Sequence, residues 1–140
     1  MIKEVEIKSL VKSALKAREN AYCFYSGYAV GAALLTETGK VFNGVNVENS
    51  SFGATNCAER SAIFSAVSAG ETEFKAIAIA GGMAGENPVD YAYPCGICRQ
   101  VMTEFCDINF DVIVAISEDD YKVIKLAQLL PTAFGPDSIK

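Results

Sequence analysis

Three of the five cysteines in this 140-residue chain are placed as metal ligands could be, and the chain contains no histidine. Cys95 and Cys98 form a C-x-x-C pair directly after Pro94, and Cys57 lies well before them. The C-x-x-C spacing alone serves redox dithiols, structural zinc and iron–sulfur sites. However, Cys57 and the pair are each expected at the start of a helix, where the helix dipole favours the metal-binding thiolate. Two such helix starts facing each other could hold three thiolates around one ion.

The number of cysteine ligands separates a catalytic zinc site from a structural one. A structural zinc normally takes four protein ligands, whereas a catalytic zinc takes three and a water molecule. Cys106 follows Cys98 in the same predicted helix and would lie ~12 Å from it along the axis, too far to share the ion. Cys23 lies in a predicted loop, where a packed thiol is the ordinary interpretation. The sequence favours three cysteines and an open position. A closed four-thiolate site that includes Cys23, in a non-enzymatic structural zinc protein, is the alternative.

Glu59 is the candidate for moving protons at such a site, because it follows Cys57 closely in the first turn of the predicted helix. Zinc lowers the pKa of water in its open position to ~7, which makes hydroxide available near neutral pH. Without histidine, Ser-His-Asp and Cys-His catalysis are excluded, and a carboxylate must carry the proton. A lone helix glutamate is usually a solvated charge, but beside a zinc ligand we favour the catalytic interpretation.

Helices and strands in a fixed order are predicted to position these groups. Helical patterns cover residues 3–20, 57–67, 95–105 and 126–130, and apolar runs predict strands over 29–35, 41–47, 74–80, 111–117 and 121–125. Gly39 is expected to take a positive φ in the first hairpin turn. Residues 81–93, which begin with two glycines, are predicted to form a long loop. Thr55 or Asn56 is expected to cap the second helix and Gly70 to end it. The order predicts an α/β fold, a three-layer α-β-α domain with a mixed five-stranded sheet.

Length and composition narrow the class of protein. A chain of 140 residues fits one domain, 1–140, and 51% hydrophobic residues fit a packed core. A net charge of −5 argues against a nucleic-acid partner. No apolar run nears the ~20 residues that span a bilayer, and the N-terminus does not resemble a signal peptide. The odd number of cysteines favours reduced thiols. We therefore expect a soluble cytoplasmic protein that binds neither nucleic acid nor membrane.

The residues around both cysteine motifs are similar to those of a known family. Residues 55–60 (TNCAER) and 93–100 (YPCGICRQ) resemble the zinc nucleoside deaminases, and the small homotetrameric cytidine deaminases fit best. The resemblance extends to residues 25–34, to the Asn-Val-Glu-Asn run at 46–49 and to residues 129–134. It implies the cytidine deaminase-like fold. It also implies hydrolytic deamination of cytidine and deoxycytidine by zinc-bound hydroxide with a glutamate proton shuttle, in pyrimidine salvage.

The same resemblance implies a role for each site residue. Cys57, Cys95 and Cys98 would bind one zinc ion per subunit. Glu59 would be the proton shuttle, and Arg60 would offset the excess negative charge of three thiolates on one divalent ion. A homotetramer with active sites shared between subunits is implied as well. The implied nucleoside contacts are Asn46 and Glu48 at the ribose 3′-hydroxyl, the Ala58 backbone at the pyrimidine carbonyl, Tyr28 as a stacking aromatic, and Phe134 reaching a neighbouring subunit's site.

The chain departs from the family pattern at two aromatic positions. Phe52 stands where a tyrosine is common, and Tyr93 replaces a frequent serine before the C-x-x-C motif. Both departures bear on substrate preference or subunit contacts. A deaminase of an aminonucleoside antibiotic such as blasticidin S is the alternative within the superfamily. That group resembles this chain at the zinc motifs but usually lacks the Asn-Val-Glu-Asn run, which is intact here.

Overall fold

The computed structural model describes residues 2–139. Met1 and Lys140, the ends of the predicted 1–140 domain, lie outside the described residues. One mixed sheet organises the fold, in the order β2-β1-β3-β4-β5. Strands β3 and β4 are parallel, and the other neighbours are antiparallel, which confirms the predicted mixed five-stranded sheet. The strands are β1 (Tyr28–Thr36), β2 (Val41–Val45), β3 (Phe74–Met83), β4 (Asp111–Ser117) and β5 (Asp120–Lys125).

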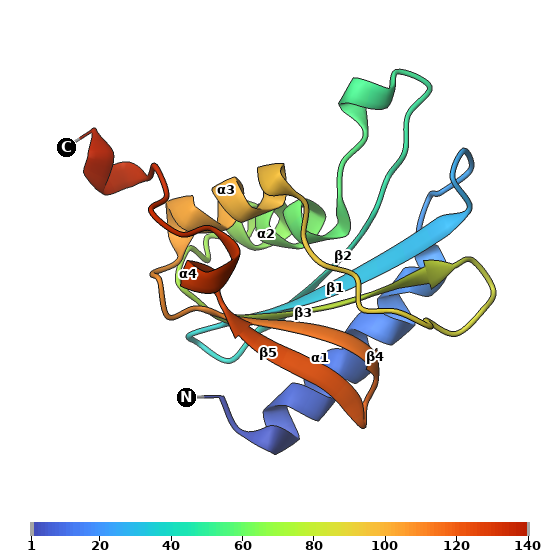
Figure 1. The fold of residues 1–140 in the computed structure, drawn as a ribbon, viewed down its shortest axis with the longest axis horizontal. Helices are drawn as coiled ribbons and strands as arrows, with labels where there is room; N and C mark the ends of the chain where they lie inside the picture. The colour runs from blue at the N-terminus through green and yellow to red at the C-terminus, as the bar shows by residue number, and fades with distance from the viewer. Residues whose placement is uncertain (1, 140) are drawn as a thin grey trace.

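Helices cover both faces of this sheet, so the predicted three-layer architecture is confirmed (Figure 1). One face carries α1 (Glu4–Ala17), which buries Leu10, Val11 and Ala14 against the sheet. The other face carries α2 (Ala58–Ser68) and α3 (Gly96–Phe105), which lie side by side and bury residues such as Ile63 and Met102. The short helix α4 (Leu126–Leu129) follows β5. Among residues 2–139, no helix combines the length and apolar character needed to cross a membrane.

A glycine on β2 lets α2 approach the sheet closely enough to place the site. A Cβ atom added to Gly44 would lie 2.3 Å from both the Ala58 carbonyl oxygen and the Ala62 nitrogen. Contacts below 3.0 Å do not occur between real Cβ atoms and backbone, so any other residue at 44 would push α2 outward. Because Ala58 opens α2, this contact sets the depth of the helix start that carries the candidate site.

Three predicted element boundaries are wrong, each for a physical reason. The first helix ends at Ala17 and not at residue 20, because residues 18–20 tighten into a 3₁₀ turn. Strand β2 ends at Val45, and beyond it the Asn46 side chain continues the pairing by bonding to the β1 backbone. Strand β3 runs on to Met83, through two glycines that were expected to begin a loop.

The predicted cap of the second helix is also wrong, whereas both predicted glycine turns are confirmed. Cys57 is the N-cap of α2, and within the described chain no side chain caps that end. The Thr55 hydroxyl accepts a hydrogen bond from the Asn49 backbone nitrogen. Gly39 and Gly70 take positive φ angles of 90° and 88°, as the hairpin turn and the helix end require.

Candidate metal centre and active site

The three cysteines of the two motifs come together where the starts of α2 and α3 meet. Cys57 is the N-cap of α2, Cys95 is the N-cap of α3, and Cys98 lies in the first turn of α3. Their sulfur atoms all lie within 4.8 Å of one another, and Cys57 Sγ and Cys95 Sγ are 3.7 Å apart. Two sulfurs bound tetrahedrally to zinc at ~2.3 Å would be about 3.8 Å apart. The donor set and its spacing therefore fit a zinc ion.

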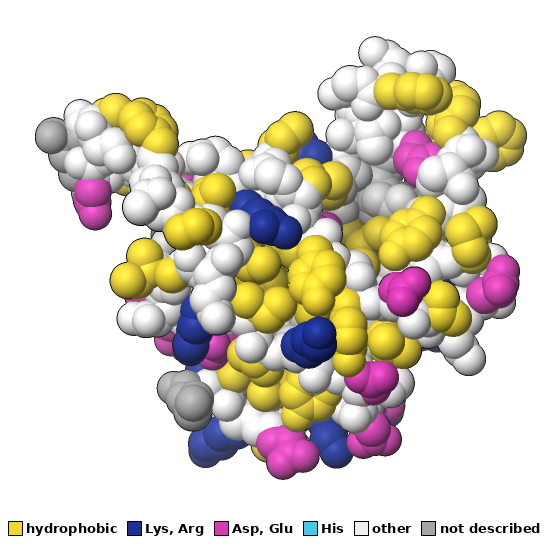
Figure 2. All heavy atoms as spheres, in the orientation of Figure 1, with side chains coloured by type: hydrophobic (Ala, Val, Ile, Leu, Met, Phe, Trp, Pro, Cys, Tyr) yellow, Lys and Arg dark blue, Asp and Glu magenta, His cyan; other side chains and the backbone are white. Residues whose placement is uncertain are grey.

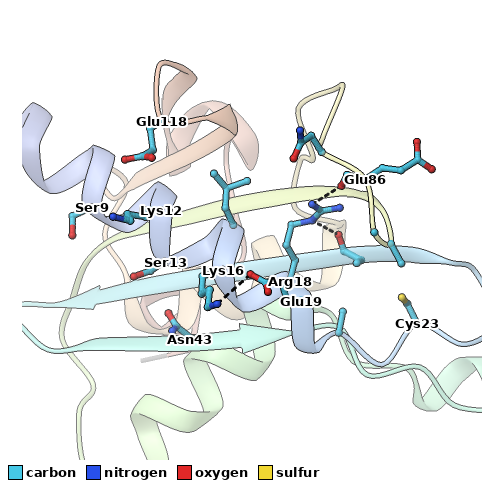
Figure 3. A pocket seen from close by; sticks show the side chains of 16 residues that line it. Ser9, Lys12, Ser13, Lys16, Arg18, Glu19, Cys23, Asn43, Glu86 and Glu118 are labelled. Atoms are coloured by element: carbon cyan, nitrogen blue, oxygen red, sulfur yellow. Dashed lines mark hydrogen bonds and ion pairs between the residues drawn. The ribbon is translucent and has the colours of Figure 1, made fainter.

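The other two cysteines do not join this cluster, which argues against the closed structural site. Within residues 2–139, the thiols and carboxylates close enough to share an ion are those of Cys57, Cys95 and Cys98. Cys23 lines a different hollow beside α1 (Figure 3). Cys106 follows the end of α3, and burial, with the nearby charge of Asp107, raises the pKa of its thiol to about 12. Three protein ligands leave a fourth zinc position open.

Arg60 supplies positive charge directly at the thiol cluster. Its Nη2 atom donates to Cys57 Sγ at 3.3 Å, and its Nε atom donates to Cys98 Sγ at 3.4 Å. Hydrogen bonding with Cys98 and then with Arg60 lowers the pKa of Cys57 to about 5, against the effect of burial. The contact with Cys57, together with burial, raises the pKa of Cys98. Hydrogen bonding within the cluster thus favours the thiolate of Cys57 over that of Cys98.

Glu59 is buried beside the cluster, with 4% of its surface exposed. Removal from water raises the pKa of its carboxyl group to about 7, and the negative charge of Cys57 adds to the effect. A carboxyl group that can be charged or neutral near pH 7 can both accept and donate a proton. The interpretation of Glu59 as a solvated helix charge does not match this position.

Glu59 and two of the thiols open onto one cavity of about 370 Å³. Tyr28, Asn46 and Ala58 line the same cavity, as the resemblance implied. Cys98 and Arg60 are absent from its lining, because Cys98 is buried behind it and Arg60 contacts the sulfurs. The remaining lining residues were not predicted as site residues: Val30, Thr55, Asn56, Ile79, Tyr91, Ala92 and Tyr93.

Asn46 and Glu48 use their side chains to hold the structure around the cavity. Asn46 Oδ1 accepts from the Val30 nitrogen at 2.9 Å, and its Nδ2 donates to the Tyr28 oxygen at 2.8 Å. Glu48 accepts hydrogen bonds from the backbone nitrogens of Tyr25 and Ser26 and from the Ser26 hydroxyl. These bonds to Ser26, and then to Tyr25, lower the pKa of Glu48. Glu48 therefore fixes the loop before Tyr28, and in this chain it does not line the cavity.

A larger hollow of about 890 Å³ lies beside α1 but lacks the chemistry of the thiol cavity. Figure 3 shows Lys12, Lys16 and Arg18 along it, together with acidic side chains such as Glu19. Its Arg18 guanidinium group bonds to the backbone, so it acts as a brace. We therefore place the functional site at the thiol cluster.

Comparison with known proteins also indicates a zinc-binding protein. A family model, the cytidine and deoxycytidylate deaminase zinc-binding region, matches residues 5–115. The chain belongs to the cytidine and deoxycytidylate deaminase family. The cytidine deaminase of Sporosarcina psychrophila is 44% identical over 135 residues, which cover 96% of each chain. The crystal structure of cytidine deaminase from Burkholderia pseudomallei aligns with a TM-score of 0.82 at 47% identity, covering 90% of this chain and 97% of that one.

Membership of the deaminase family confirms the cytidine deaminase-like fold and zinc as the cofactor, and the three-thiol cluster is compatible with a zinc site. The antibiotic deaminases are represented by the blasticidin-S deaminase of Bacillus cereus. It is 33% identical over 111 residues, which cover 75% of this chain and 76% of that protein. The cytidine deaminase of Sporosarcina psychrophila therefore matches a larger share of the chain at higher identity than this antibiotic deaminase does.

Phe134 lies apart from the cavity of its own chain. Its side chain is 63% exposed on the C-terminal segment, which projects from the body of the deaminase fold (Figure 1). The Gln100 side chain donates a hydrogen bond to the Phe134 carbonyl oxygen at 2.7 Å and so ties this segment to α3. The segment is thus held in place while its aromatic ring stays available for contacts outside the chain.

Some of the unpredicted cavity residues could have been identified from the sequence, and others could not. Tyr91 and Ala92 lie four and three residues before Cys95, so proximity to the C-x-x-C motif is a usable signal for them. Val30 and Ile79 lie inside apolar strands, where an ordinary core position gives the same pattern. Only the register of β1 against β3 brings them to the cavity.

Proposed function

We propose that this chain catalyses the hydrolytic deamination of cytidine and deoxycytidine to uridine and deoxyuridine, releasing ammonia. The observation that carries the proposal is the sharing of one cavity by buried Glu59, two thiols of the cluster and Asn46. The three features combine a metal position, a proton carrier and a polar group for a sugar hydroxyl. Relatives that bear the name cytidine deaminase match nearly the whole chain, which supports the same substrate class.

Cys57, Cys95 and Cys98 are the proposed zinc ligands, with one ion in each chain. Zinc supplies a water-derived nucleophile at neutral pH by lowering the pKa of water to ~7. Arg60 stabilises the thiolate forms of Cys57 and Cys98 by donating hydrogen bonds to both sulfurs. These bonds favour the deprotonated ligands that metal binding requires, in addition to the effect of the bound cation itself.

Glu59 is proposed to carry the protons of the reaction. Its carboxylate takes a proton from the attacking water and delivers it to the ring nitrogen beside the amine-bearing carbon. After the carbon–oxygen bond forms, Glu59 takes the second proton from the added oxygen and passes it to the amine. The carbon–nitrogen bond then breaks, the added oxygen becomes the carbonyl of the uracil ring, and ammonia leaves. Its burial supports both steps, because removal from water brings its pKa to about 7.

The remaining cavity residues are proposed to orient the nucleoside. The Asn46 amide keeps one N–H beyond its bond to Tyr28, and that N–H is proposed for the ribose 3′-hydroxyl. Glu48 is proposed for the same hydroxyl from the family resemblance, although its carboxylate bonds to the loop at Ser26 and lies outside the lining of the cavity. The Ala58 backbone, at the start of α2, is proposed to donate to the pyrimidine carbonyl. Tyr28 is proposed as the stacking aromatic.

We also propose a homotetramer in which Phe134 completes the site of a neighbouring subunit. Apolar side chains remain exposed on the helix layer, including Phe64 and Val67 on α2 and Ile97 on α3. Phe52 and Phe134 are exposed as well. Figure 2 shows hydrophobic side chains on the two parts of the molecule that project at the upper left and the upper right. Such apolar surface is typical of a face covered by another subunit. All five cysteines are free thiols, which supports a reducing, cytoplasmic location.

Ultraviolet-monitored conversion of cytidine by the purified, zinc-loaded protein tests the proposal, with the released ammonia assayed in parallel. We expect both cytidine and deoxycytidine to be converted, with one ammonia released for each nucleoside consumed. Blasticidin S is assayed in the same panel. Turnover of the antibiotic without turnover of cytidine would replace the proposal with the antibiotic deaminase. Absence of any turnover in a folded, zinc-loaded sample would contradict an enzymatic role.

A further inference from the structure

One long segment connects β3 to the metal-binding start of α3 and forms part of the cavity wall. It leaves β3 after Met83 and ends at Cys95. Arg18 braces its beginning, donating from Nη2 to the Met83 oxygen at 3.1 Å. It also donates from Nη1 to the Glu86 oxygen at 2.9 Å, as Figure 3 shows. The same guanidinium group donates from Nε to the Ala29 oxygen at 3.1 Å. The first half of the segment is therefore fixed to the 3₁₀ turn that follows α1 and to β1.

The segment then folds back along the end of β3. A Cβ atom on Gly82 would lie 2.9 Å from Pro88 Cα, and one on Gly81 would lie 2.9 Å from Ala92 Cβ. The two glycines in the strand therefore create the space that the returning segment occupies. The Tyr28 ring shares this space, because its hydroxyl oxygen would be 3.0 Å from a Cβ on Gly81. The wall formed by residues 91–93 and the Tyr28 ring are thus positioned together.

The second half of the segment is held to a distant strand through the side chain of Tyr91. The Tyr91 hydroxyl donates a hydrogen bond to Asp120, the first residue of β5. Lys122, also on β5, places its Nζ atom 4.7 Å from the centre of the Tyr91 ring. Tyr91 itself lines the cavity, whereas among residues 2–139 none from β5 does. An edge strand outside the site therefore holds part of its wall.

We propose that the Tyr91–Asp120 hydrogen bond positions the cavity wall at residues 91–93 for nucleoside binding, so that Tyr91 and Asp120 are positioning residues of this enzyme. The inference rests on the proposed function and deepens it. The metal ligands and Glu59 are carried by the starts of α2 and α3. Losing the bond to β5 releases the wall while those groups stay in place. The effect is therefore on binding of the nucleoside and not on the chemical step.

The test compares Asp120→Ala, Asp120→Asn and Tyr91→Phe in the zinc-loaded enzyme. Cytidine kinetics give KM and kcat, and titration calorimetry gives the Kd of uridine without any turnover. Asp119→Asn is the matched control, because Asp119 is a neighbouring exposed acid that pairs with Lys8. Zinc content and melting temperature are measured for each variant, so that a folding defect is recognised.

We expect Asp120→Ala and Tyr91→Phe to raise KM for cytidine and Kd for uridine about five- to tenfold, as for one lost hydrogen bond to a charged group. The value of kcat should stay within about twofold, since the chemical groups are untouched. Asp120→Asn should restore most of the binding, because its amide oxygen still accepts from the tyrosine. The double variant Tyr91→Phe/Asp120→Ala should be no worse than either single variant, because both remove the same bond.

Two results would overturn the inference while leaving the proposed function standing. One is that the wild-type enzyme deaminates cytidine while Asp120→Ala has the wild-type KM for cytidine and the wild-type Kd for uridine. The other is a fall in kcat accompanied by loss of zinc, which would assign the contact to holding Cys95. Failure of the wild-type enzyme to deaminate cytidine is a separate result, which would overturn the proposed function and this inference with it.

Discussion

The Nη2 atom of Arg60 lies 3.3 Å from Cys57 Sγ, and both residues belong to the start of α2. The same guanidinium group reaches across to Cys98 on α3 through its Nε atom. One cation therefore contacts sulfur ligands from both helices. Three thiolates around a divalent ion leave one excess negative charge, and Arg60 lies where it can offset that charge. The two helix starts are linked by this residue independently of any metal.

Replacing Arg60 should weaken zinc binding. In Arg60→Ala the thiols lose the charge that favours their ionised forms, and we expect zinc affinity to fall about 10- to 100-fold. The zinc affinity of Arg60→Lys should lie between those of Arg60→Ala and the wild type, because an ammonium group keeps the positive charge but cannot contact both sulfurs through two nitrogen atoms. Competition with a chromogenic chelator measures the affinity. Equal zinc affinity in Arg60→Ala and wild type would show that the guanidinium group is not needed by the ligands.

Replacing Glu59 should stop proton transfer while leaving the metal in place. Glu59→Gln keeps the shape of the side chain but cannot accept a proton, so kcat should fall about 10²- to 10⁴-fold. Zinc content should stay near that of the wild type, because Glu59 is outside the three-sulfur cluster of the described chain. Glu118→Gln, which changes an exposed acid at the hollow beside α1, is the matched control. Near-normal turnover in Glu59→Gln would contradict the assigned role.

The chemistry of the metal centre could be predicted from sequence because its signals are local. Cys57 and Glu59 share one helical turn, and Cys95 and Cys98 share another, so spacing alone places each pair. Exclusion of Cys106 also followed from helix geometry, whereas setting Cys23 aside needed the structure. The function itself came from resemblance, since the same spacing serves several kinds of metal site.

The parts that sequence did not reveal depend on contacts between distant segments. The bond from Tyr91 to Asp120 joins a loop to an edge strand, and neither residue carries a pattern that points to the other. Glycines 81 and 82 suggested a loop because glycine weakens an isolated strand. The reason for glycine at these positions is apparent only in the structure, where Pro88 and Ala92 pack too closely against them for a Cβ atom to fit. The N-cap of α2 was misplaced for a similar reason, because Cys57 holds that position for its sulfur and not as a capping group.

Substituting Gly44 should displace α2 and so disturb both stability and the site. The added methyl group in Gly44→Ala would overlap the backbone of Ala58 and Ala62. We expect the free energy of unfolding to fall by about 3 kcal/mol, at the upper end for overpacking against a rigid neighbour. Denaturant unfolding measures the loss, with Gly53→Ala as control, since a Cβ at Gly53 meets nothing within 4 Å. An equal loss of unfolding free energy in Gly44→Ala and Gly53→Ala would contradict the prediction, because it would mean that α2 can move away from β2 without destabilising the fold.

Phe134 should act on the site of another subunit, which co-expression can test. Phe134→Ala alone should raise KM for cytidine about tenfold through loss of an aromatic contact. When chains carrying Phe134→Ala are co-expressed with chains carrying Glu59→Gln, some sites combine an intact Glu59 with an intact Phe134 from the neighbour. The activity at low cytidine concentration, divided by the number of chains that keep Glu59, should then be higher in the mixture than in the Phe134→Ala enzyme. Wild-type chains co-expressed with Glu59→Gln chains give the dilution control. If Phe134 served the site of its own chain, every site with an intact Glu59 would stay impaired and mixing would restore nothing.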